Sequence, residues 1–177
     1  MKTKLFFVLI VVLLNTQINA QCWQSISTSD HTIAIKSDGT LWSWGSNSSG
    51  EIGDGTIIDK NVPTKIGLDT DWKFISAGMN QSFSIKNDGT LWAWGDNTYG
   101  ELGDGTNISR SIPFKIGVET NWLSISGGFW HTIALKSDGT LWGWGENSWG
   151  DIGDGTNTNK NTPVKIGSEA NWQSISA

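Results

Sequence analysis

The chain has 177 residues, a length that suits a single domain. Its 22 Gly and 12 Trp against only three Pro favour short strands joined by tight turns and argue against a helical protein. The net charge is −5 and becomes −7 without residues 1–20, which hold Lys2 and Lys4 and no acid. Because the charge is negative and the basic residues form no stripe, we expect no binding to nucleic acid.

Residues 1–20 are predicted to be a signal peptide for export. Lys2 and Lys4 precede an unbroken apolar run over 5–14, and the polar stretch that follows ends at the small residue Ala20. The run is too short for a membrane span, which needs about twenty residues. A buried N-terminal strand or helix is the alternative. We therefore expect a secreted or cell-surface protein, or a periplasmic one in a bacterium, with no membrane span in the rest of the chain.

Cys22 is the only cysteine, so no disulfide can form within the chain. A lipid anchor on Cys22 is one reading, but Gln21 stands where a lipoprotein signal has a small residue. An incidental free thiol near the new N-terminus is the other.

Internal repetition organises residues 21–177. Trp23, Trp72, Trp122 and Trp172 open near-identical segments about fifty residues apart. The repeats are assigned to residues 23–71, 72–121, 122–171 and, in part, 172–177.

Each repeat has room for four short strands. In the third repeat we expect them at 122–126, 131–136, 140–145 and 163–166, with Pro163 at the start of the last, where a lost donor is tolerated. The Asp-Gly pair at 138–139 predicts a hairpin turn in which both residues have positive φ.

Four antiparallel strands in about fifty residues describe a β-propeller blade, so the predicted fold class is all-β. Blades cover one another on both faces, which explains why neighbouring strand residues are both apolar. The third strands hold paired tryptophans: Trp42 and Trp44, Trp92 and Trp94, Trp142 and Trp144. We expect these pairs to fill the space between blades; ligand stacking is the alternative.

The third repeat resembles the RCC1 (regulator of chromosome condensation) repeat family, whose signature joins a Gly-x-x-His strand, Asp-Gly, Trp-Gly and Asn-x-x-Gly-x-Ile-Gly. The matching residues are Gly128, His131, Thr132, Ala134, Leu135, Asp138, Gly139, Trp144, Gly145, Asn147, Gly150, Ile152 and Gly153. The first repeat has His31 without the preceding Gly, and the second has Gln81 and Ser84 in place of His and Ala.

The resemblance implies a seven-bladed propeller. Three complete repeats cannot close a ring, because natural propellers have roughly four to eight blades. We therefore expect a piece of a larger propeller completed by missing blades; closure of the ring by oligomerisation is the alternative.

Two sets of residues could carry chemistry. His31 and His131 lie two repeats apart, so we expect no metal site but hydrogen bonds to nearby backbone that tie a strand to a loop. The acidic pairs are Glu51 and Asp54, Glu101 and Asp104, Asp151 and Asp154. Because the pairs recur with the repeat, a role in turn structure is favoured over calcium binding and over catalysis. We expect no catalytic residue, metal or cofactor.

Loop positions that differ between repeats are the candidate binding residues. One set is Ser29-Asp30, Met79-Asn80 and Phe129-Trp130; another is Ser49, Tyr99 and Trp149. Rigid aromatic side chains suit recognition of protein or sugar, whereas local packing or drift would also explain them. The candidate ligand-binding residues are Met79, Asn80, Tyr99, Phe129, Trp130 and Trp149.

These observations predict a secreted, non-catalytic protein-binding or scaffold module whose partner is an unidentified protein. Guanine-nucleotide exchange, the activity of the family's namesake, is an alternative, although the export signal and the acidic charge oppose it. A structural segment of a larger cell-surface protein is another alternative, and an enzyme acting on polysaccharide through loop carboxylates is a third.

Overall fold

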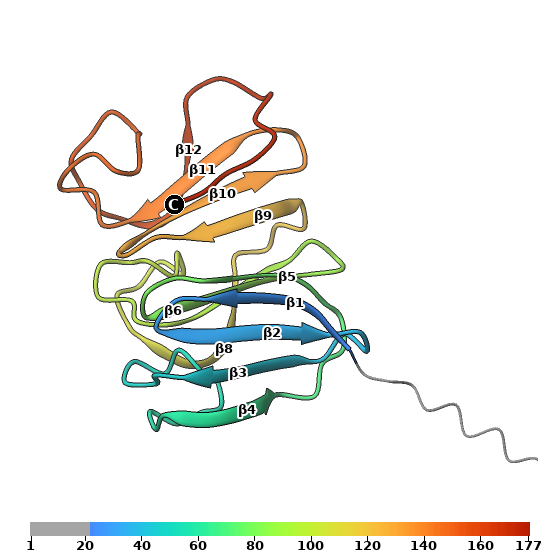
Figure 1. Ribbon diagram of the computed structural model, residues 1–177. Coiled ribbons are helices and arrows are strands. Elements are labelled where there is room, and N and C mark those ends of the chain that lie inside the picture. The colour runs from blue at the N-terminus through green and yellow to red at the C-terminus, as the bar shows by residue number, and fades with distance from the viewer. Residues whose placement is uncertain (1–21) are drawn as a thin grey trace, which may run out of the picture.

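The computed structural model describes residues 22–177, so the predicted signal peptide lies outside the described residues. The described chain is all-β, as predicted, with three four-stranded antiparallel sheets (Figure 1). The strands are β1 (Trp23–Thr28), β2 (His31–Lys36), β3 (Leu41–Gly45), β4 (Lys60–Ile66), β5 (Trp72–Ala77), β6 (Gln81–Lys86), β7 (Leu91–Gly95), β8 (Arg110–Ile116), β9 (Trp122–Gly127), β10 (His131–Lys136), β11 (Leu141–Gly145) and β12 (Lys160–Ile166). Within residues 22–177 there is no helix of the length and apolarity needed to cross a membrane.

Each sheet is one blade of a propeller and is built from one repeat. Blade 1 contains β1–β4, blade 2 contains β5–β8 and blade 3 contains β9–β12. The strands pair in chain order, so the first and fourth strands form the two edges of each blade. The first strands β1, β5 and β9 contact one another in succession, so they line the axis around which the blades are arranged. Figure 1 shows the blades following one another from the blue end of the chain to the red end.

The hydrophobic core lies between the blades. Ile33, Leu41 and Ile52 of blade 1 pack against Trp72 and Trp94 of blade 2. A second cluster with the same plan joins blade 2 to blade 3 and includes Phe83, Leu102, Trp122 and Trp144. The apolar face of a blade is therefore shielded from solvent only where another blade covers it.

The paired tryptophans take two different positions. Trp94 and Trp144 are completely buried, which confirms that one member of the pair in blades 2 and 3 fills the space between blades; in blade 1, Trp42 and Trp44 are both only partly buried. The other member is only partly buried: Trp92 lies edge-on to Trp72, with 5.7 Å between ring centroids, and Lys86 Nζ stands 4.7 Å from its ring.

The hairpins between second and third strands differ from the prediction at one residue. Gly39 has a φ of 77°, but no residue other than glycine has positive φ within 22–177. Gly39 N donates to Lys36 O at 2.9 Å, and Lys36 N donates to Thr40 O at 3.0 Å. This is a three-residue loop in which a type I turn is followed by a left-handed glycine. Asp38 keeps negative φ because its carboxylate accepts hydrogen bonds from Thr40 N and Oγ1, at 3.0 and 2.6 Å.

The fourth strands are longer than predicted. β12 begins at Lys160, so Pro163 lies inside the strand and not at its start. Its register with β11 shifts between Gly143 and Gly145, opposite the segment that holds the proline. Because β12 pairs only with β11 within its sheet, proline removes no hydrogen bond from a second neighbour.

Candidate functional site

Two kinds of loop leave each blade at the same end. In blade 1, His31 pairs with Gly45, so the loop before β2 and the loop after β3 begin side by side. Blades 2 and 3 repeat this pairing. We call the surface formed by these loops the loop face; it comprises residues 29–30, 46–59, 79–80, 96–109, 129–130 and 146–159. The Asp-Gly hairpins lie at the opposite end of the blades. We call this end the hairpin face; it comprises residues 37–40, 67–71, 87–90, 117–121, 137–140 and 167–171, with the strand ends that border them.

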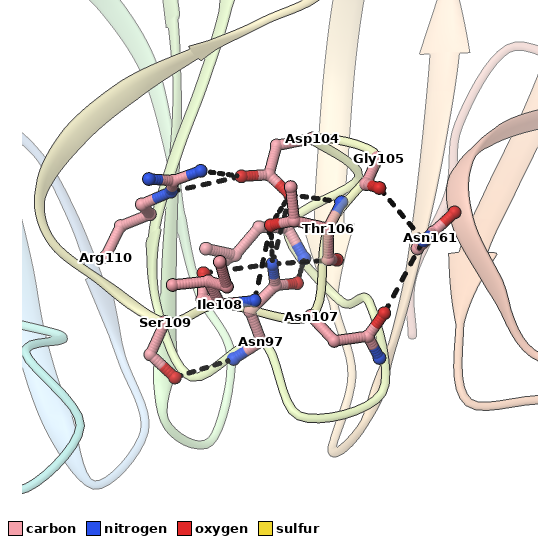
Figure 2. A network of polar contacts seen from close by, with 10 residues as sticks. Asn97, Asp104, Gly105, Thr106, Asn107, Ile108, Ser109, Arg110 and Asn161 are labelled. Atoms are coloured by element: carbon pink, nitrogen blue, oxygen red, sulfur yellow. Dashed lines mark hydrogen bonds and ion pairs between the residues drawn. The ribbon is translucent and has the colours of Figure 1, made fainter.

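A buried asparagine holds each long loop in shape. In blade 2, Asn97 Nδ2 donates to the carbonyl oxygens of Thr106 and Ile108, at 3.1 and 3.2 Å, and its Oδ1 accepts from Leu102 N at 2.9 Å (Figure 2). Asn47 and Asn147 make the corresponding bonds in their blades. These hydrogen bonds fix the backbone of each long loop and so hold its exposed side chains in place.

The second carboxylate of each acidic pair has the structural role that the sequence favoured. Asp104 accepts from Thr106 N at 2.9 Å and forms an ion pair with Arg110 at 2.6 Å (Figure 2). Hydrogen bonds from Thr106 and Arg110 outweigh burial and lower the pKa of Asp104. The same ion pairs recur between Asp54 and Lys60 and between Asp154 and Lys160.

The first carboxylate lies at a joint between blades in two of the three pairs. Glu51 and Glu101 are completely buried, whereas Asp151 is exposed. Burial raises the pKa of Glu101 to about 7, against backbone hydrogen bonds that favour its charged form. No group of three or more His, Cys, Asp or Glu residues within 22–177 is arranged to hold a metal ion.

His31 links two blades, and its predicted hydrogen bond to nearby backbone is not its main contact. His31 Nε2 lies 2.6 Å from Ser82 Oγ in blade 2, and Ser82 Oγ donates to Glu51 O at 2.7 Å. The serine oxygen therefore accepts from Nε2–H, which leaves Nδ1 as a buried atom without a hydrogen bond. Burial lowers the pKa of His31 to about 4, against smaller opposing effects of Asp30 and the Met79 backbone. His131 is only partly buried, with its ring beside Gly128.

Three of the predicted binding residues come together on the loop face. Tyr99 of blade 2 lies against Trp130 of blade 3, with 5.8 Å between ring centroids, and Phe129 stands edge-on to Trp130 at 4.6 Å. All three rings are exposed, between 38% and 51%. We call Tyr99, Phe129 and Trp130 the aromatic cluster. It is a contiguous apolar patch that spans two blades.

The other three candidates are placed differently. Trp149 is the most exposed of them, at 85%, and contacts no ring of the aromatic cluster. Asn80 is tied down through its backbone, because its carbonyl oxygen accepts from Asp96 N at 2.9 Å. Met79 lines a hollow at the axis.

That axial hollow has a volume of about 380 Å³ and is lined by equivalent segments of the three blades. Asp30, Met79 and Phe129 belong to blades 1, 2 and 3, and glycine backbone lies between them. Phe129 also belongs to the aromatic cluster, so hollow and cluster form one continuous surface. Variation between repeats was the signal that identified these residues in the sequence, although it did not show that they meet.

Comparison with known protein families gives two matching models, each described as a regulator of chromosome condensation (RCC1) repeat. One matches residues 88–135 and 138–177, and the other matches 27–51, 72–101 and 122–150. No curated protein sequence matches the chain.

Several solved structures share the fold. Prp20p of Saccharomyces cerevisiae, described with its binding to Gsp1p and histones, is 25% identical with a TM-score of 0.73, and 84% of this chain is covered. Yeast RCC1 (Prp20) bound to Kap60 is 21% identical with a TM-score of 0.77 and 89% coverage. Human WBSCR16 is 21% identical with a TM-score of 0.72 and 82% coverage. The chain spans only 39–40% of the length of these proteins.

Proposed function

This chain belongs to the RCC1 repeat family, and we propose that it works as a protein-binding module whose contact surface is the loop face. The observation that carries the proposal is the aromatic cluster, in which Tyr99, Phe129 and Trp130 expose adjoining rings across two blades. Aromatic side chains are the usual anchors of protein interfaces, because they bury a large area at a small entropic cost.

The support beneath the cluster favours recognition by a preformed surface. Tyr99 lies in the loop that Asn97 and Glu101 hold from inside: Tyr99 N donates to Glu101 Oε2 at 2.8 Å. Trp130 is fixed through its backbone, since its carbonyl oxygen accepts from Glu146 N at 2.9 Å. A partner that binds here would pay little for ordering the loops.

Prp20p, which shares the fold of this chain, is described with its binding to Gsp1p and to histones. That supports protein binding as the class of function, but it does not identify the partner of this chain. Because the chain spans about two fifths of Prp20p, a complete ring around the axis is part of the proposal.

Two further parts of the proposal come from the sequence. We propose export of the chain, on the evidence of the charged, apolar and small residues of 1–20. We also propose that the module is non-catalytic, because the recurring loop carboxylates serve other ends. Asp54, Asp104 and Asp154 pair with basic residues, and Glu51 and Glu101 are buried at the joints.

The proposal is tested with Trp130→Ala. Proteins captured by immobilised residues 22–177 from the native extracellular fluid are identified by mass spectrometry, and the purified partner is then titrated by calorimetry. We expect Trp130→Ala to weaken binding at least about tenfold, as for a central interface aromatic.

The matched control is Leu68→Ala, which removes an 87% exposed apolar side chain outside the loop face. It should change affinity less than about twofold. Equal affinity of wild type and Trp130→Ala for the partner would overturn the assignment of the loop face.

A further inference from the structure

We infer that the partner presents a basic side chain, arginine or lysine, to the axial hollow of the loop face. This inference rests on the proposed function and names the chemistry of the partner. Three observations carry it: the pairing of the basic residues on this face, the balance of charge on the other face, and the lining of the hollow.

On the loop face and at the strand ends that border it, every basic side chain forms an ion pair. Lys60, Arg110 and Lys160 pair with Asp54, Asp104 and Asp154 at 2.8, 2.6 and 3.1 Å. The face also carries Asp30, Asp59 and Asp96, and no ion pair within residues 22–177 involves any of these three. The loop face therefore has an excess of negative charge.

The hairpin face does not share this excess. Lys86 there pairs with Asp69 and Asp71, and Lys136 pairs with Glu119 at 2.9 Å. Both lysines also lie over tryptophan rings of their own blade. Hydrogen bonds from Thr40 and Thr90 lower the pKa values of the hairpin residues Asp38 and Asp88. Lys65 and Lys115 of the fourth strands lower them further and balance their charge. The net negative charge of residues 22–177 is thus concentrated on the loop face, which would steer a cationic surface toward it.

The axial hollow offers the contacts that a basic side chain needs. Its lining includes Asp30, which carries a carboxylate, Phe129, which carries an aromatic ring, and Met79, which carries a polarisable thioether. A guanidinium or ammonium group is attracted both to a carboxylate and to the face of an aromatic ring. The volume of about 380 Å³ is large enough for a long side chain and part of its backbone.

The aromatic cluster continues this surface outward. An extended basic segment that enters the hollow would next meet Trp130 and Tyr99, on which a second cation or an aliphatic stem could stack. An acidic or a purely apolar segment would gain only the apolar contact and would face the uncompensated carboxylates. The surface as a whole therefore selects for positive charge.

The test uses defined peptides as probes. Acetylated tetra-arginine amide, tetra-citrulline amide and tetra-glutamate amide are titrated into residues 22–177 at about 0.15 M salt, where the Debye length is about 8 Å. Binding is followed by the Trp130 indole resonance, which is assigned with Trp130→Phe. We expect tetra-arginine to bind, and tetra-citrulline, which has the same shape without charge, to bind at least about fivefold more weakly.

Two variants separate a local site from general attraction. Asp30→Asn removes one negative charge at the hollow, and Glu169→Gln removes one at an exposed position on the hairpin side. We expect Asp30→Asn to weaken tetra-arginine binding about fivefold and Glu169→Gln to weaken it less than about twofold. Equal losses in the two variants, or equal binding of citrulline or glutamate peptides, would overturn the inference.

The outcome is independent of the test of the proposed function. If partner capture depends on Trp130 while tetra-arginine does not bind, the loop face binds proteins and the basic-partner inference is wrong. If tetra-arginine binds at Asp30 but Trp130→Ala leaves the affinity for the partner unchanged, the hollow is a cation site and the proposed function is wrong.

Discussion

Trp94 donates its indole N–H to the carbonyl oxygen of Glu51, at 2.9 Å, across the joint between blade 1 and blade 2. The same carbonyl oxygen accepts from Ser82 Oγ at 2.7 Å. The joint between blades 2 and 3 repeats the arrangement, with Trp144 and Thr132 donating to Glu101 O. Both donors sit on the later blade and the acceptor on the earlier loop, so the blades are joined by polar bonds as well as by apolar packing.

Trp94→Phe should destabilise the protein by about 3 kcal/mol, because it removes a buried hydrogen bond and leaves a small cavity at the joint. Urea unfolding followed by circular dichroism measures the change. Trp92→Phe is the matched control, since its indole N–H donates to Thr90 Oγ1 within its own blade. We expect less than half the loss for Trp92→Phe; equal losses would contradict a special role of the joint.

His31→Gln should change how stability depends on pH. The folded-state pKa of His31 is about 4, below its usual 6.5, so the unfolded chain binds more protons between these values. In the wild type this group therefore lowers the free energy of unfolding as pH falls from 6.5 to 4, by about 3 kcal/mol in all. Gln, the residue that blade 2 has at position 81, does not titrate and should remove this loss.

The measurement is urea unfolding at pH 7, 6 and 5 for wild type and His31→Gln. The variant should gain stability relative to the wild type at each step toward acid. Parallel curves would show that His31 is not held neutral at the joint.

Glu101→Gln should have the opposite effect on the same curves. The folded-state pKa of Glu101 is about 7, above its usual 4.5, so the folded chain binds more protons between these values. The stability that this group provides is complete below pH 4.5 and is lost as pH rises to 7, by about 3 kcal/mol. Glu101→Gln should therefore lose stability relative to the wild type as pH falls from 7 to 5.

In the wild type the two groups act against each other, and stability should change little between pH 7 and 5. The double variant, His31→Gln with Glu101→Gln, serves as the control and should be similarly flat. A double variant as steep as either single variant would contradict the assignment of these two groups.

Gly45→Ala should be more costly than Gly67→Ala, although both glycines have positive φ, 113° and 62°. A Cβ at position 45 would lie 2.7 Å from His31 Cα, whereas at position 67 it would meet nothing within 4 Å. We expect about 3 kcal/mol of destabilisation at position 45 and about 1 kcal/mol at position 67. Thermal unfolding of the two variants compares them directly, and equal shifts in Tm would exclude the contact with His31 as the cause.

Much of each blade could be read from the sequence, because the interactions within a blade are local and recur with the repeat. The strand 131–136 was predicted with the bounds that β10 has. The errors were also local: Asp38 avoids positive φ by bonding to Thr40, and Pro163 lies inside an edge strand where its missing N–H costs nothing.

The repeat unit, its strands, its glycine turns and its family signature are thus properties of the sequence, since each depends on residues close together in the chain. The relations between repeats were decided by the packing of one blade on the next. Blade 2 covers Glu51 and blade 3 covers Glu101, whereas Asp151, in blade 3, is exposed. The same packing places His31 against Ser82. It also brings Tyr99 to Trp130 and places Asp30 and Phe129 in the lining of one hollow at the axis. Nothing in the positions of these residues along the chain predicts that they are in contact, because only the packing of blades around a common axis makes them neighbours.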